Sequence, residues 1–148
     1  MAQKIFKGRV IAGGNLKGEA IVSHEGMNTL ATFQKSALKN AKQIIASDQN
    51  NKDLYQKNIT GKIVCLPTTI GSTTGGMVLQ TVCSMGINPS AFLFSQTIDT
   101  LAGSGIILAK VWEESPIIAI DNLGSDFLNT VKSGDEIEIK EDGTVIIN

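Results

Sequence analysis

The sequence lacks a surplus of charge of either sign. Its 148 residues include 13 Lys and Arg against 14 Asp and Glu, for a formal net charge of -1. Nucleic-acid-binding and membrane-surface proteins usually show a clear excess of basic residues. Aromatic residues make up only 5% of the chain, which leaves little material for base-stacking platforms. The composition therefore predicts that neither nucleic acid nor a membrane is a partner.

Cysteine and histidine are nearly absent, which limits metal and nucleophilic chemistry. Cys65 and Cys83 fall within apolar segments and form no Cys-x-x-Cys pair, so we expect buried free thiols in a reducing compartment and no metal site. The single histidine, His24, has no second ligand or nucleophile nearby, which favours a loop residue over a catalytic one. There is no membrane-length apolar run, and the N-terminus MAQKIFKGRV has no apolar leader core, so we expect a cytoplasmic protein.

Apolar residues are present in the share typical of a globular protein. The hydrophobic content is 42%, and the length predicts one domain over residues 1–148. Short apolar runs that resemble buried strands occur at 63–66, 91–94 and 117–120. Because these runs alternate with helical patterns, they predict a parallel core. The predicted fold class is α/β, a mixed and partly closed sheet flanked by helices.

The flanking segments predict hairpins and further helices. Residues 5–12 and 18–23 are expected to pair as one hairpin, and 136–140 and 144–147 as another. Helical spacing covers 32–46, although Ile44-Ile45-Ala46 can equally be a short extended piece. Further helices are expected after 78, from about 98 to 112, and as a short turn after Ser125.

The most informative stretch is GKIVCLPTTIGSTTGG, residues 61–76. Its first part has the composition of a buried strand, Pro67 ends that strand, and helical spacing begins near Val78. A loop that leads into a helix N-terminus presents unpaired backbone N–H groups, and glycines let a ligand approach them. The loop also carries hydroxyl groups, on Thr69, Ser72, Thr73 and Thr74. The alternative is a simple helix cap, since Ser, Thr and Gly are ordinary residues there.

This stretch, together with residues 88–91, 106–109 and 115–118, resembles the small swivelling subunit of the aconitase X family. The resemblance runs from residue 7 to about 147 and is weakest over 27–51. It implies a swivelling β/β/α domain and a hydro-lyase activity related to that of aconitase. Some members of the family dehydrate phosphorylated mevalonate in archaea, and others dehydrate cis-3-hydroxy-L-proline in bacteria.

The resemblance also implies roles for residues and partners. The serine of the glycine–serine signature is the family's proton acceptor, and it corresponds to Ser72. A large catalytic subunit is implied as the partner in a heterodimer that acts on a small hydroxy acid. An iron–sulfur cluster, where the family has one, belongs to that large subunit, and Cys65 and Cys83 do not match its ligands. We therefore expect no cofactor in this chain.

The chemistry of dehydration is consistent with an active site that is shared between this chain and a partner subunit. Dehydration needs a base that takes the proton beside the carboxylate and an acid that helps hydroxide leave. A serine is too weak a base unless donors hold the developing alkoxide. The neighbours expected to supply such donors, or to hold the substrate carboxylate, are Gly71, Thr73, Thr74 and Gly75. No carboxylate dyad, metal cluster or Ser–His–Asp set is visible in the sequence, so the isolated chain is expected to be inactive.

Two departures from the family pattern and two other function classes remain. Ile70 stands where many relatives carry an arginine, and residues 33–37 stand where relatives tend to be glycine-rich, so the substrate preference can differ. One alternative function is a non-catalytic anion-binding or regulatory module that uses the Gly71–Gly76 loop. The other is a phosphohistidine-type carrier, which is disfavoured because His24 lies outside that loop and no Thr–His pair occurs.

Overall fold

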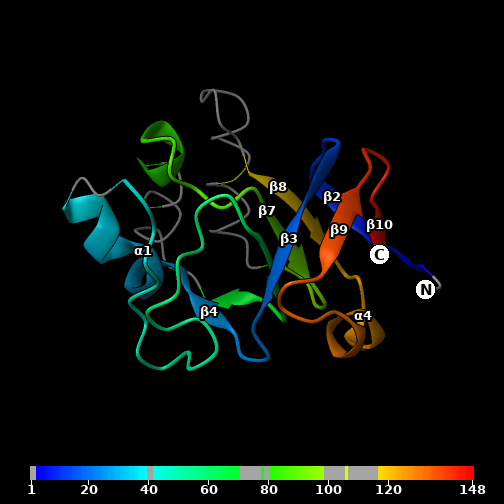
Figure 1. Ribbon diagram of the computed structural model, residues 1–148, viewed down its shortest axis with the longest axis horizontal. Helices are drawn as coiled ribbons and strands as arrows, with labels where there is room; N and C mark the ends of the chain where they lie inside the picture. Colours follow the sequence, from blue (N-terminus) through cyan, green and yellow to red (C-terminus); the bar gives the residue numbers. More distant parts are fainter. Residues whose placement is uncertain (1–2, 40–41, 71–77, 79–80, 99–105, 107–116) are drawn as a thin grey trace.

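A computed structural model describes residues 3–39, 42–70, 78, 81–98, 106 and 117–148. The strands are β1 (Lys4–Lys7), β2 (Arg9–Ala12), β3 (Leu16–Val22), β4 (Met27–Asn28), β5 (Ile63–Leu66), β6 (Thr69–Ile70), β7 (Ala91–Phe94), β8 (Ile118–Asp121), β9 (Glu136–Ile139) and β10 (Thr144–Ile147). The helices with described bounds are α1 (Thr29–Leu38) and α4 (Ser125–Thr130). Figure 1 shows their arrangement.

One eight-stranded mixed sheet forms the body of the protein, in the order β1-β10-β9-β3-β5-β7-β8-β2. Strands β3, β5, β7 and β8 run parallel to one another, whereas β1, β2, β9 and β10 pair antiparallel with their neighbours. The predicted α/β class with a mixed, partly closed sheet is confirmed. The predicted apolar runs at 63–66 and 91–94 correspond to β5 and β7, and the run at 117–120 to β8, shifted by one residue.

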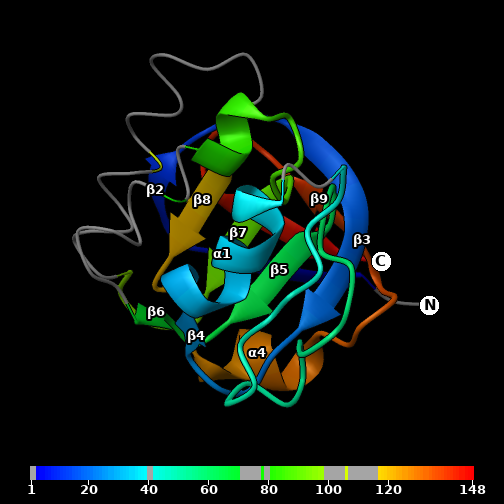
Figure 2. The same cartoon turned by 90° about the vertical axis from the view of Figure 1, so that its left-hand side faces the viewer.

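The parallel part of the sheet is buried on both faces, which explains its continuous apolar runs. All residues of β5 and β7 are buried. Alternate side chains enter two hydrophobic clusters: Val64 and Phe92 face the cluster that contains Phe33 of α1, and Ile63 faces the cluster that contains Phe127 of α4. In Figure 2, α1 lies in front of β5 and β7, and α4 lies at the lower end of the sheet.

The sheet nearly closes on itself because its two edge strands are consecutive in the chain. Only Gly8 separates β1, which pairs with β10, from β2, which pairs with β8. A Cβ atom at Gly8 would lie 2.4 Å from the carbonyl oxygen of Asp121, so only glycine fits at this corner. Gly8 N–H donates to the carbonyl of Gly143, 3.1 Å away, which ties the corner to the β9–β10 hairpin.

The predicted N-terminal hairpin is wrong. Residues 5–12 form two strands that pair with β10 and β8, and β3 pairs with β5 and β9 instead of with either of them. The reason is burial: Ala20, Ile21 and Val22 are buried, so β3 is a central strand. Residues 5–12, its expected partner, are divided at Gly8 into the two edge strands of the sheet. The C-terminal hairpin of β9 and β10 is confirmed.

The structure of the segment between α1 and β5 decides whether residues 44–46 are helical or extended, which the sequence left open. Helix α1 begins three residues earlier than expected and ends at Leu38, with Asn28 Oδ1 accepting from Ala31 N at 3.0 Å as its N-cap. Residues 44–46 are extended, and Ile45 bridges Asn58. The predicted helix from 98 to 112 lies outside the described residues except for its first residue and Ile106, which is helical and buried.

Candidate functional site

The carboxyl ends of β3, β5, β7 and β8 meet at one edge of the sheet, here called the rim. In α/β sheets, ligands bind in the crevice outside the carboxyl ends of parallel strands. The chain leaves these strands at Ser23, Pro67, Ser95 and Asn122. Strand β6, which leads into the predicted site loop, follows β5 at this edge and lies beside β4 (Figure 2). The rim is therefore where the candidate site begins.

The predicted catalytic and substrate-binding residues lie outside the described residues. They are Gly71, Ser72, Thr73, Thr74 and Gly75, and Gly76 lies with them. What the structure describes is the chain on both sides of them. Before the loop, β6 ends at Ile70, and after it Val78 and residues 81–84 are helical. The strand, loop and helix order predicted from the sequence is therefore confirmed at both flanks, and the roles of the loop residues stay predictions.

Strand β6 is held in place by the start of α1. It pairs in parallel with β4, with Met27 opposite Thr69 and Asn28 opposite Ile70. Met27 N–H donates to the carbonyl of Thr68 at 3.1 Å, and the Met27 side chain is fully buried. Because Asn28 also caps α1, the helix N-terminus lies beside the last described residue before the loop. The positive end of the α1 dipole therefore lies next to the point where the loop begins.

A chain of hydroxyl and amide groups continues from Thr68 along the rim. Thr68 Oγ1 donates to the carbonyl of Thr97 at 2.9 Å, and Thr97 Oγ1 donates to Asn122 Oδ1 at 2.9 Å. Asn122 has a φ of 57°, a left-handed conformation that asparagine tolerates better than most residues. These bonds connect the segments that follow β5, β7 and β8, so they fix the backbone from which the loop leaves the sheet.

Arg9 and Asp121 form a clamp at the same edge. Arg9 Nε donates to Asp121 Oδ1 at 2.9 Å and its Nη2 donates to Oδ2 at 2.7 Å. The Asp121 side chain is fully buried, whereas 55% of the Arg9 side chain is exposed. Asp121 Oδ2 also accepts from Ile98 N at 2.9 Å. These hydrogen bonds, and then the charge of Asp121, raise the pKa of Arg9 above its ordinary value.

The sequence interpretation missed this clamp. Arg9 and Asp121 are separated by 112 positions, so no local pattern relates them. One signal was present: Arg9 is the only arginine in a chain that otherwise uses lysine. Arginine presents a planar fork that matches a carboxylate bidentately, which lysine cannot do. The rim therefore carries the guanidinium group of Arg9, although Ile70 stands where many relatives carry an arginine.

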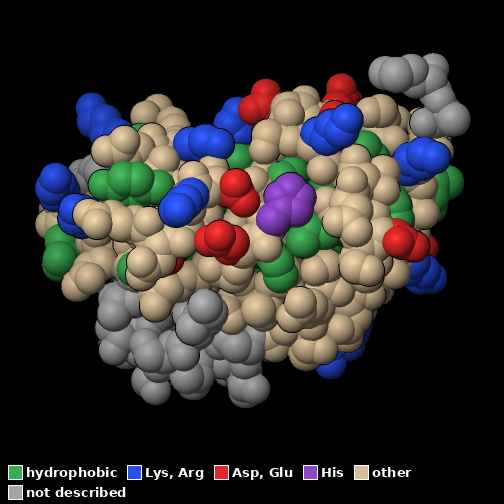
Figure 3. Space-filling model, turned by 90° about the horizontal axis from the view of Figure 1, so that it is seen from below, with side chains coloured by type: hydrophobic (Ala, Val, Ile, Leu, Met, Phe, Trp, Pro, Cys, Tyr) green, Lys and Arg blue, Asp and Glu red, His purple; other side chains and the backbone are tan. Residues whose placement is uncertain are grey.

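The turn after β3 contains His24 and a buried polar pair. Ser23 and Asn51 are buried, and Asn51 Nδ2 donates to Ser23 Oγ at 2.9 Å. His24 is exposed, with Nδ1 3.8 Å from Asp53 Oδ2, and the histidine is visible at the surface beside acidic side chains in Figure 3. His24 is thus a loop residue, as expected. The Ser23–Asn51 pair anchors the 47–54 segment to the end of β3.

Both cysteines are buried and neither forms a disulfide bond, as expected. Cys65 and Cys83 belong to different hydrophobic clusters, so they do not form a common site. Burial, and to a lesser degree the charge of Asp135, raises the pKa of the Cys65 thiol far above its usual range, so it stays protonated. Within the described part of the chain, no group of His, Cys, Asp and Glu could hold a metal ion. No described helix has the length and apolar character needed to span a bilayer.

Comparison with known proteins identifies the family. A family model described as the aconitase X swivel domain matches residues 5–147. The chain belongs to the aconitase X swivel-domain family. It is 29% identical over 137 residues to a phosphomevalonate dehydratase small subunit of Thermococcus onnurineus, covering 93% of this chain and 92% of the relative. It is 30% identical over 145 residues to a protein of the same name from Thermococcus kodakarensis, covering 93% and 98%.

A solved structure agrees with this assignment to the aconitase X family. The crystal structure of Thermococcus kodakaraensis aconitase X in its holo-form contains a chain that superposes with a TM-score of 0.80 and 25% sequence identity. The match covers 98% of both chains. The resemblance found in the sequence is therefore confirmed at the level of the family and of the swivel fold.

Proposed function

We propose that this chain is the small subunit of an aconitase-X-type hydro-lyase that removes water from a hydroxy acid together with a large partner subunit. The observation that carries the proposal is the match to the aconitase X swivel domain over residues 5–147. The curated relatives are named phosphomevalonate dehydratase small subunits, so phosphomevalonate is the first substrate to test. cis-3-Hydroxy-L-proline is the second, because other members of this family act on it. Residues 1–148 act in this proposal as one swivel domain.

Ser72 is the proton acceptor in this proposal. The proton to be removed lies on the carbon next to a carboxylate, and it is acidic only while the developing negative charge is held by donors. Gly71 and Gly75 let backbone N–H groups approach the substrate, and Thr73 and Thr74 add hydroxyl donors. The clamped rim and the N-terminus of α1 support this role because they fix the strand that leads into the loop.

The large subunit supplies the remaining chemistry. An acid or Lewis acid must help the hydroxide leave, and the described residues offer no such cluster. An iron–sulfur cluster would not fit Cys65 and Cys83, because both thiols are buried in separate hydrophobic clusters. This chain therefore contributes the proton-accepting loop and binding groups, and the assembly is a heterodimer.

The decisive experiment replaces one hydroxyl in the reconstituted two-subunit complex. Ser72→Ala should lower kcat on the order of 10²–10⁴-fold, the usual contribution of a positioned base. Co-elution with the large subunit should be unchanged, because one loop hydroxyl adds little to an interface. Ser84→Ala is the matched control, since Ser84 is an exposed hydroxyl on the helix that follows the loop. Unchanged turnover in Ser72→Ala would favour the alternative of a non-catalytic anion-binding module.

A second measurement tests the division of labour between the subunits. The purified chain alone should show no turnover of phosphomevalonate or cis-3-hydroxy-L-proline, because in this proposal the group that assists the leaving hydroxide belongs to the large subunit. Adding the large subunit should restore activity on one of the two substrates. Substantial activity of the chain alone would contradict the two-subunit proposal.

A further inference from the structure

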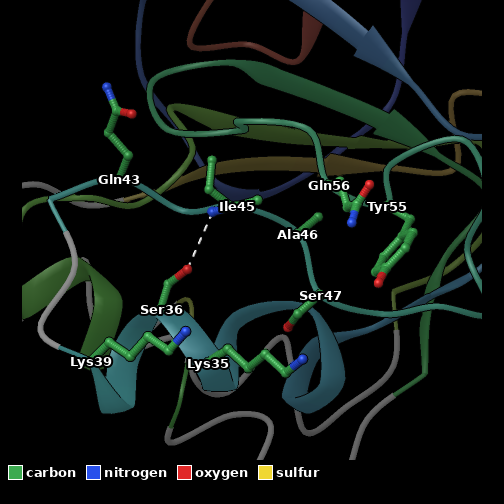
Figure 4. A pocket seen from close by; sticks show the side chains of 9 residues that line it. All are labelled: Lys35, Ser36, Lys39, Gln43, Ile45, Ala46, Ser47, Tyr55 and Gln56. Carbon is green, nitrogen blue, oxygen red and sulfur yellow. Dashed lines mark hydrogen bonds between the residues drawn. The ribbon is translucent and has the colours of Figure 1, made fainter.

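A pocket of about 270 Å³ lies between the second half of α1 and the segment 43–56. Lys35 and Lys39 line it from the helix, and Gln43, Tyr55 and Gln56 line it from the segment. Figure 4 shows both lysine side chains extended along the helix edge of the pocket, with the Tyr55 ring on the other side. Asn28 lies seven residues before Lys35, so the pocket is about 10 Å along the helix from the rim. It is therefore separate from the rim.

Both charged groups of this pocket are cations. Lys35 and Lys39 are exposed and one helical turn apart, a spacing at which like charges repel by about 0.2–0.5 kcal/mol. Neither lysine forms an ion pair within the part of the chain that the structure describes, and no carboxylate lines the pocket. A dianion placed between the two ammonium groups would replace this repulsion with two attractions.

The remaining lining suits a ligand with a short carbon skeleton. Ile45 is 44% exposed, and it borders the pocket with Ala46, so both offer apolar surface to a ligand. The hydroxyls of Ser36 and Ser47 are already used: Ser36 Oγ accepts from Ile45 N at 3.2 Å, and Ser47 Oγ donates to the α1 carbonyls. These bonds hold the two walls of the pocket together.

The surrounding charge strengthens the attraction for anions. Residues 29–62 contain six lysines and two aspartates, a net charge of +4, whereas residues 121–148 carry a net charge of -5. The formal net charge of the whole chain, -1, does not reveal this asymmetry. In Figure 3, Lys and Arg side chains are visible at the left, on the α1 side of the molecule, and others lie at the right. Such a local excess raises the concentration of anions near the surface and speeds their binding.

We propose that this pocket binds a small phosphate ester, with Lys35 and Lys39 holding the phosphate and Ile45 and Tyr55 contacting the carbon skeleton. Lysine is a common phosphate ligand as a point charge, and no rigid fork is needed here. The volume lies just below the range of roughly 300–1,000 Å³ for drug-sized ligands, which suits a short-chain metabolite. The site goes beyond the proposed dehydration, because it does not involve Ser72 or a partner subunit.

The test is a titration of the full chain followed by amide NMR shifts. Glycerol 3-phosphate is the probe, inorganic phosphate is the comparison, and chloride at matched ionic strength controls for screening. We expect saturable shifts around Lys35, Lys39, Ile45 and Gln56, with the ester binding more tightly than inorganic phosphate. The substitution pair K35Q/K39Q should weaken binding at least 10-fold, and K35R/K39R should retain it.

The matched control is K52Q/K57Q, which removes the same charge from two exposed lysines outside the pocket lining. It should change the affinity less than twofold, and Ser72→Ala should not change it. An equal loss in both double variants would overturn the proposal, because it would show attraction by the general field alone. Shifts that do not saturate, or that centre on residues 71–77, would overturn it as well. Failure here would leave the turnover experiments on Ser72 unaffected, since binding is measured without the large subunit.

Discussion

The parallel and antiparallel halves of the sheet are built in different ways. In the parallel half, β5 and β7 are buried on both faces, and Phe92 packs edge-on against Phe33 at 6.4 Å and stacks with Phe94 at 5.7 Å. In the antiparallel half, β1 is mostly exposed and β9 alternates between exposed and buried residues. The first half is stabilised by packing on both sides, and the second by one apolar face and its turns.

This difference explains where the candidate site lies. The parallel strands end together at the rim, and their positions are fixed by two hydrophobic clusters rather than one. A loop that must place a hydroxyl accurately gains from a rigid support of this kind. The antiparallel half closes the sheet and contributes Arg9 to the rim, through its pair with Asp121.

The largest effect should come from opening a cavity in the parallel half. Phe92→Ala should lower the free energy of unfolding by about 3–5 kcal/mol, because the Phe92 side chain is fully buried on the face of the sheet that α1 covers. Phe6→Ala is the matched change in the antiparallel half, where Phe6 is only partly buried against Phe127. It should cost roughly 1–2 kcal/mol. Urea unfolding of both variants measures the difference, and equal costs would contradict the distinction between the halves.

The next effect should come from the corner that closes the sheet. Gly8→Ala should destabilise the protein by about 1–3 kcal/mol, since the new methyl would meet the backbone oxygen of Asp121 at 2.4 Å. Gly18→Ala is the control within β3, where the methyl would meet side-chain atoms, Cδ1 and Cγ1 of Ile63 at 3.1 and 3.3 Å, and no backbone atom as close as the one at Gly8. We expect that control to be near neutral in thermal unfolding. If Gly8→Ala left the stability unchanged, the corner between β1 and β2 would not be as tightly packed against Asp121 as described here.

The same contrast explains what could be predicted from the sequence. Strands β5 and β7 were predicted because burial on both faces leaves continuous apolar runs, and Pro67 marks where β5 ends. The helix after the loop extends to Ser84, and Gly86 follows it with a φ of 73°, the left-handed conformation typical of the residue after a helix C-terminus. These signals are local. They also placed the loop between strand and helix, and together with the family signature they led to the prediction that Ser72 is the proton acceptor.

The pairing of the antiparallel strands could not be predicted in the same way. Residues 5–12 have the composition of one strand, and only the close approach of Asp121 to Gly8 shows why they form two. The two-residue strands β4 and β6 are too short to leave a pattern, and Thr68, Thr97 and Asn122 meet only in the folded chain. The sequence thus located the loop, but the groups that support it come from distant segments.

The smallest effect should come from the turn between β9 and β10. Asp142 Oδ1 accepts from Thr144 N at 2.9 Å, and the hydrogen bonds from Thr144 hold the pKa of Asp142 below its ordinary 3.8. A lowered folded-state pKa contributes stability that is present above pH 3.8 and is lost as the pH falls through the lower folded value. Asp142→Asn should therefore lower the urea midpoint slightly at pH 7 and not at pH 2. The gap should persist in 0.5 M salt because its main cause is a hydrogen bond, and an equal gap at both pH values would contradict this account of the turn.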